Sequence, residues 1–113
     1  MNTFEFFSLL FLLLNERWED NKDVMLGHFL SEMNPYAWTT EDSADPAVYE
    51  EFKTFMADKS FGEDNGFSLV APYLDSITFY PDLKRFLADV DPKIWNNAVQ
   101  QFMNQPHKGE KHG

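Results

Sequence analysis

Carboxylates are the abundant reactive side chains of this chain, and they gather at the two ends of one predicted helix. The two acidic groups are Glu41, Asp42 and Asp45 before that helix and Asp58, Glu63 and Asp64 after it. A carboxylate pair acts as general acid and base only where both groups share a pocket. An EF-hand calcium loop counted from Asp58 would need glycine where the chain has Glu63. We interpret both groups as solvated loop and cap residues.

Other catalytic chemistry has little to build on. The chain has no cysteine, and His28 is the one histidine outside the C-terminal tail. A serine or threonine nucleophile needs a base held beside it, and we interpret His28 as a structural or surface residue. His28 and Glu32 are four positions apart, but a metal site needs three or four ligands. We therefore predict no catalytic residue, no metal site and no cofactor.

Two aromatic residues stand beside the first acidic group. Tyr36 and Trp38 lie in a polar stretch that ends with Glu41, Asp42 and Asp45. Tyrosine and tryptophan often anchor protein interfaces, and flanking charge speeds the capture of an oppositely charged partner. Large rings are also commonly buried, so the alternative is that this loop folds back and both rings cap the core. These five residues are the first part of a predicted partner-binding site.

The stretch Phe4–Leu14 is the element around which the rest must pack. Its large apolar residues run round the whole helix, which indicates burial on all sides. A transmembrane helix needs about 20 apolar residues, whereas this run stops at Asn15. No basic residue precedes the run, as a signal peptide would require. We predict a buried core helix that is capped by Asn2 or Thr3.

Helical spacing and prolines predict the remaining elements. The expected helices cover residues 24–34, 46–59, 70–80, 81–90 and 92–105. Asp20 or Asn21 could cap the second helix, and we favour two separate helices over one long bent one. Pro72 is tolerated only in a first turn, which places the start of that helix at Val70 or Ala71. The last helix is expected to bury Ile94, Trp95, Ala98, Val99, Phe102 and Met103.

The fold class that follows is all-α, a compact bundle of five or six helices around the N-terminal hydrophobic helix. A chain of 113 residues forms one domain, which we predict to cover residues 1–105. The polar tail of residues 106–113 is predicted to be disordered. No stretch shows the sustained alternation of a β-strand.

The net charge of −10 limits the partners. Such a chain repels nucleic acid phosphates and anionic membranes, so we predict no direct nucleic acid partner and no membrane. A basic protein is the expected partner, although a negative surface also serves solubility alone. The absence of cysteine and of an export signal predicts a cytoplasmic protein. The oligomeric state is open, and a homodimer is one alternative.

The segment Ser76–Pro81, followed by a helix that opens on Asp91-Pro92, locally resembles the short third helix of the colicin-DNase immunity proteins. In that family a pair of tyrosines before the proline makes the contact with the nuclease. The resemblance implies that Phe79 and Tyr80 would occupy those positions here. It covers six residues, and the preceding chain does not match, so the chain is not assigned to the family.

The leading functional hypothesis is a small acidic protein-binding domain without catalytic activity. Its size, charge and lack of cysteine are typical of immunity proteins and antitoxin-like inhibitors, which neutralise cationic toxins. One alternative is an acidic mimic of DNA, which needs regularly spaced charges on one face. Another is a hydrolase that uses carboxylates, and a structural homodimer is a third. The predicted site comprises Tyr36, Trp38, Glu41, Asp42, Asp45, Phe79 and Tyr80.

Overall fold

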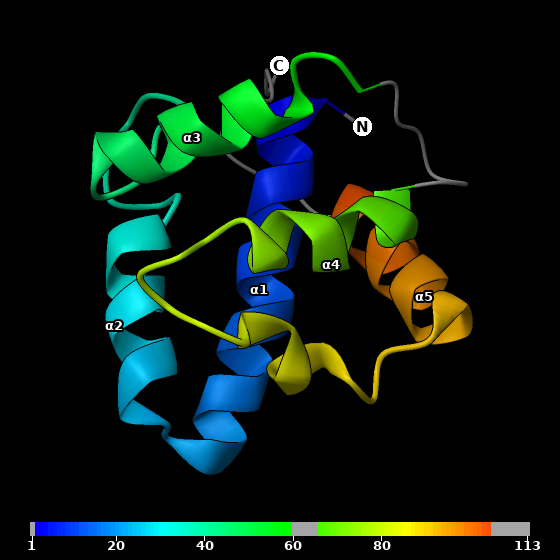
Figure 1. The fold of residues 1–113 in the computed structure, drawn as a ribbon. Helices are drawn as coiled ribbons and strands as arrows, with labels where there is room; N and C mark the ends of the chain where they lie inside the picture. The colour runs from blue at the N-terminus through cyan, green and yellow to red at the C-terminus, as the bar shows by residue number, and fades with distance from the viewer. Residues whose placement is uncertain (1, 60–65, 105–113) are drawn as a thin grey trace.

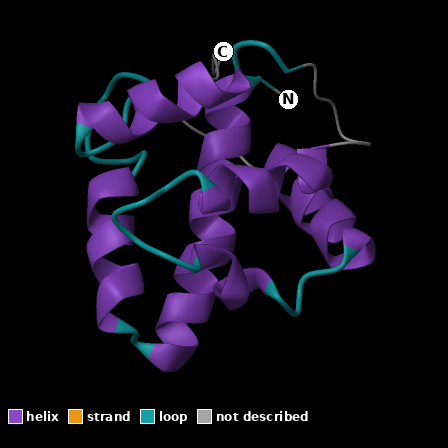
Figure 2. Ribbon diagram, in the orientation of Figure 1, coloured by secondary structure: helices purple, strands orange, loops and turns teal. Residues whose placement is uncertain are grey.

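The structure is a computed structural model that describes residues 2–59 and 66–104. Its helices are α1 (Thr3–Asn21), α2 (Val24–Met33), α3 (Pro46–Met56), α4 (Gly66–Asp75), the 3-10 helix η1 (Leu83–Leu87) and α5 (Pro92–Met103). No strand occurs within those two ranges (Figure 2). The all-α prediction is confirmed. The predicted tail and the acidic residues Glu63 and Asp64 lie outside the described residues.

Helix α1 runs through the middle of the molecule, as its sequence predicts. In Figure 1, α2 lies along one side of α1, α3 crosses its upper end, α4 crosses in front and α5 lies on the other side. Nine of its residues are buried, from Phe4 to Leu14. Asn2 caps the helix: its side chain accepts from the amide of Glu5, whose carboxylate accepts from the amide of Asn2 in return. This reciprocal capping box satisfies two amides that would otherwise lack partners.

Aromatic rings fill the space where α1 meets α3, α4 and α5. Ring centroids lie 5.0 Å apart for Phe7 and Phe52, 4.8 Å for Phe52 and Tyr73, and 5.6 Å for Phe6 and Trp95. Tilted and edge-on pairs of this kind add to the stabilisation that comes from burial. The high phenylalanine content of the sequence is therefore used mainly to join the central helix to its neighbours.

The first two helices are separate, as predicted, but they are divided later than Asp20 or Asn21. Lys22 adopts a left-handed conformation with φ 53°, and Asp23 caps α2 by accepting from the amide of Leu26. Since α2 folds back along α1, the chain needs a sharp reversal here, and the left-handed residue provides it. Gly27 then lies against Trp18, where an added Cβ would come within 2.8 Å of the indole nitrogen.

Helix α4 corrects one prediction. We expected it to start at Val70 or Ala71 and end at Tyr80, but it spans Gly66–Asp75 with Pro72 in its interior. Pro72 lies on the exposed face. It has no N–H to donate within the helix, but water can reach the backbone there. Burial of Val70, Tyr73 and Leu74 stabilises the helix despite the proline. The residues from 76 to 82 are left as a loop, which carries Phe79 and Tyr80.

One predicted core residue of α5 is also corrected. Ile94 keeps 39% of its surface exposed, whereas Trp95, Val99 and Phe102 are buried as expected. Ile94 lies in the first turn of α5, at the rim of a groove rather than under another helix. Among the described residues, no helix is both long enough and apolar enough to cross a membrane.

Candidate functional site

The loop between α2 and α3 is a compact, closed segment. Its two ends meet where the amides of Ala44 and Asp45 donate to the carbonyls of Asn34 and Glu32, at 2.9 Å each. Fully buried Ser43 ties the loop to α3, because its hydroxyl donates to the carbonyl of Asp45 and accepts from the amide of Tyr49. The predicted site residues on this loop are therefore held on a rigid segment, of the type called an Ω-loop.

Tyr36 and Trp38 each have part of the ring against the molecule and part in solvent. Trp38 is 51% exposed, and its indole N–H donates to the carbonyl of Ser43 at 2.7 Å. Tyr36 is 46% exposed and packs edge-on against Phe11 at 6.1 Å between centroids. Partial burial raises the pKa of the Tyr36 phenol. Both rings help to fix the loop, and both present apolar surface outside it.

A pocket of about 270 Å³ lies where α2, the start of α3, α4 and the loop after α4 meet. We call it the acidic–aromatic pocket. It is lined by Phe29, Glu32, Asp45, Ala47, Val48, Glu51, Tyr73, Ile77, Phe79 and Tyr80. In Figure 1, the loop that follows α4 reaches towards α2. The ring of Tyr80 packs against Phe29 of α2 at 5.3 Å, so this loop and α2 form one wall.

Tyr80 and Glu32 form the polar contact that closes this wall. The hydroxyl of Tyr80 donates to Oε1 of Glu32 at 2.5 Å. This hydrogen bond, partial burial and the negative charges of Glu32 and Asp45 raise the pKa of Tyr80 to about 12. The phenol therefore stays neutral and remains a donor at physiological pH. Deep burial, with a smaller effect of the Glu51 carboxylate, also raises the pKa of Tyr73 at the pocket floor.

The three carboxylates of the pocket differ from their neighbours in having no cation partner among the described residues. Glu50, next in the chain to Glu51, pairs with Lys53 at 3.1 Å, and Asp75 pairs with Lys84 at 3.1 Å. Within the described ranges, no Lys, Arg or His forms an ion pair with Glu32, Asp45 or Glu51. The pocket thus combines uncompensated negative charge with apolar and aromatic walls.

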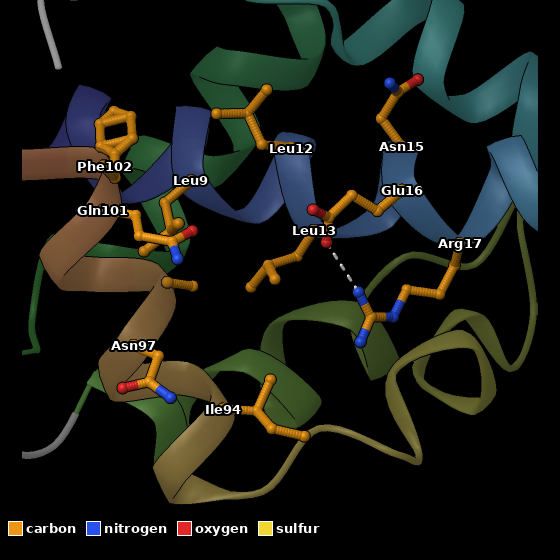
Figure 3. A pocket seen from close by; sticks show the side chains of 11 residues that line it. Leu9, Leu12, Leu13, Asn15, Glu16, Arg17, Ile94, Asn97, Gln101 and Phe102 are labelled. Atoms are coloured by element: carbon orange, nitrogen blue, oxygen red, sulfur yellow. Dashed lines mark hydrogen bonds and ion pairs between the residues drawn. The ribbon is translucent and has the colours of Figure 1, made fainter.

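Another hollow is a groove between α1 and α5 whose lining is partly apolar and partly polar. Figure 3 shows Leu13 of α1 and Ile94 of α5 pointing into it from opposite sides. Its charged end is already satisfied, because Arg17 contacts Glu16 and Asp89 at 3.0 Å each. The groove therefore offers no unpaired charge or reactive group, and the acidic–aromatic pocket is the better candidate for a site.

The predicted site residues are only partly brought together. Asp45, Phe79 and Tyr80 come from separate parts of the sequence and line one pocket. Tyr36, Trp38, Glu41 and Asp42 stay on the Ω-loop and do not line it. The charges of Glu41 and Asp42 instead affect Tyr49. Burial, followed by these two negative charges, raises the pKa of Tyr49 to about 12.

Sequence reasoning missed two of the pocket carboxylates. The sequence indicates Glu32 only as a neighbour of His28 and assigns Glu51 to no site, although both line the pocket. One signal was available in the sequence. On its helix, Glu32 follows the buried Phe29 by three positions, and Glu51 immediately precedes the buried Phe52. A carboxylate at such a position lies at the edge of the buried face.

Comparison of the chain with protein-family models, with curated proteins and with solved structures found no match.

Proposed function

We propose that this protein is a non-catalytic binding domain that engages a basic partner protein, of the immunity-protein or antitoxin-like inhibitor type. The observation that carries the proposal is the acidic–aromatic pocket. Three carboxylates that pair with no cation of residues 2–59 and 66–104 surround it, and Phe79 beside them is 91% exposed. The lack of cysteine is consistent with action in the cytoplasm.

Two features of the pocket support binding of a protein. An exposed aromatic ring next to a concave surface is typical of an interface anchor, whose neighbours exclude water around it. Phe79 is not part of the hydrophobic core that the described residues form. The net charge of −10 adds a long-range attraction that speeds encounter with a cationic surface.

The experiment is affinity capture from the lysate of the source cell, at low and then at high salt, with wild type and single variants. Phe79→Ala removes the exposed ring, and Val24→Ala removes an exposed apolar side chain that does not line the pocket. We expect a basic protein whose capture falls at least about fivefold in Phe79→Ala, the usual effect of an anchor residue. Capture should be unchanged in Val24→Ala and should weaken with salt.

Variants of the Ω-loop test the rest of the predicted site. Trp38→Ala and the combined change Glu41→Gln, Asp42→Asn and Asp45→Asn should also reduce capture, and asparagine retains the helix cap at position 45. Equal capture by all variants contradicts the proposal. A captured DNA-binding protein that is released by duplex DNA would favour the acidic DNA mimic instead.

A further inference from the structure

The acidic–aromatic pocket has the size expected of a site for one side chain. Its volume of about 270 Å³ is smaller than the pockets of drug-sized ligands, which begin at about 300 Å³. Its floor and walls are mainly apolar, with four aromatic residues: Phe29, Tyr73, Phe79 and Tyr80. An occupant that matches this pocket is therefore about the size of one side chain and partly apolar.

The charges of the pocket determine which chemical group the occupant must carry at its end. Oε1 of Glu32 is held by the Tyr80 hydroxyl, and Oδ1 of Asp45 is held by the amide of Ala47 at 3.1 Å. Each carboxylate is thus oriented through one oxygen, and the described residues give the other oxygen no hydrogen bond. Glu51 accepts no hydrogen bond from the described residues at either of its carboxylate oxygens. Three negative groups at one mainly apolar pocket favour a cationic occupant.

We propose that the acidic–aromatic pocket receives an arginine side chain of the basic partner, an inference that rests on the proposed function and specifies its chemistry. The methylene groups of arginine would lie along Val48 and Ile77, and the guanidinium would reach the carboxylates of Glu32, Asp45 and Glu51. Phe79, at the rim, would cover the inserted chain from solvent.

Arginine fits these walls better than lysine does. A guanidinium is planar, stacks on aromatic rings and donates two parallel hydrogen bonds to a carboxylate. It is also more weakly hydrated than an ammonium group, so its transfer into an apolar pocket costs less. Lysine, a compact and strongly hydrated point charge, would gain less from the aromatic walls.

The experiment is a titration of the full-length, ¹⁵N-labelled protein with blocked single amino acids, followed by amide chemical shifts. The probes are Nα-acetyl-arginine amide, the lysine equivalent and the citrulline equivalent, which has the shape of arginine without its charge. We expect arginine to bind most tightly, with shifts centred on the pocket residues, lysine several-fold more weakly, and citrulline not at all.

Glu51→Gln removes one pocket charge and no hydrogen bond or ion pair of the described residues, and it should weaken arginine binding about threefold, as expected for a partly exposed pair. The matched control is Glu50→Gln, a neighbouring carboxylate already paired with Lys53, which should leave binding unchanged. Citrulline binding as tightly as arginine, lysine binding at least as tightly, or shifts away from the pocket would each overturn the inference. The titration uses no partner, so its failure alongside Phe79-dependent capture from lysate would leave the proposed function intact.

Discussion

At the scale of single residues, Tyr80 connects the stability of the fold to the candidate site. Its hydroxyl orients Glu32, and its ring packs on Phe29, so the loop after α4 is fastened to α2 by one side chain. The pKa of Tyr80, about 12, lies above the ordinary value of 10.0. The folded state therefore favours the neutral phenol more strongly than the unfolded state does.

The sign of the resulting pH dependence follows from this difference. The stabilisation by neutral Tyr80 is fully present below pH 10 and is lost as the pH rises from about 10 to about 12. Tyr80→Phe should lower the free energy of unfolding at pH 8 by about 1 kcal/mol, the usual net value of a hydrogen bond. The difference between wild type and variant should shrink when urea unfolding is repeated at pH 10 and 11.

Tyr36→Phe provides the control, because the described residues give the Tyr36 hydroxyl no hydrogen bond. This variant should lose less than about 0.5 kcal/mol at pH 8, as is usual for a surface change. A constant difference between wild type and Tyr80→Phe over the whole pH range would show that the Tyr80–Glu32 contact does not form.

At the scale of secondary-structure elements, the reversal between α1 and α2 sets the position of one pocket wall. Lys22 is left-handed, and such a conformation costs a residue with a Cβ about 1 kcal/mol relative to glycine. Lys22 also pairs with Glu19 at 3.0 Å and lies 4.1 Å from the centre of the Trp18 ring. Replacement of Lys22 by glycine would therefore change the stability in two ways: it relieves the cost of the left-handed conformation and it removes these side-chain contacts.

Comparing Lys22→Gly with Lys22→Ala separates them, since both variants lose the same side-chain contacts. We expect Lys22→Gly to be more stable than Lys22→Ala by about 1 kcal/mol in urea unfolding. The same pair of substitutions at Asp20, which is still within α1, should give the opposite order, because glycine is disfavoured in a helix. If alanine is favoured at position 22, the left-handed turn is wrong.

Most elements could be predicted because their signals are local. Asn2, Asp45-Pro46 and Asp91-Pro92 mark helix starts, and the structure begins helices there. The predicted bounds of α4 were wrong because they took account only of the local cost of a proline within a helix. Tertiary burial of Val70, Tyr73 and Leu74 outweighs that cost, and this burial depends on contacts with distant helices.

At the scale of the whole molecule, repulsion among carboxylates opposes folding. The net charge is −10, and the ion pairs of the described residues lie at the surface, where each contributes at most about 1 kcal/mol. Added salt screens both attraction and repulsion, as the screening length falls from about 30 Å at 0.01 M to about 8 Å at 0.15 M. With this excess of negative charge, relief of repulsion should be the larger effect.

We therefore expect the melting temperature to rise between 10 and 150 mM NaCl, by about 4 °C if the gain approaches 1 kcal/mol. Scanning calorimetry measures this directly. A variant with Asp20→Asn, Glu41→Gln and Glu51→Gln carries three fewer negative charges and should show a smaller rise. A melting temperature that falls with salt would mean that the ion pairs outweigh the repulsion.

The sequence by itself determined the all-helical class, the central position of α1, most helix starts and the acidic character of the molecule. These properties follow from composition, periodicity and capping, which act over a few residues. Only the tertiary structure decided which charges share a site. It joined Glu32 and Asp45 to Glu51 and Tyr80 across four segments, and left Glu41 and Asp42 elsewhere. The reason is physical: a pocket forms where helices fail to fill the space between them, which depends on how they pack rather than on any one of them.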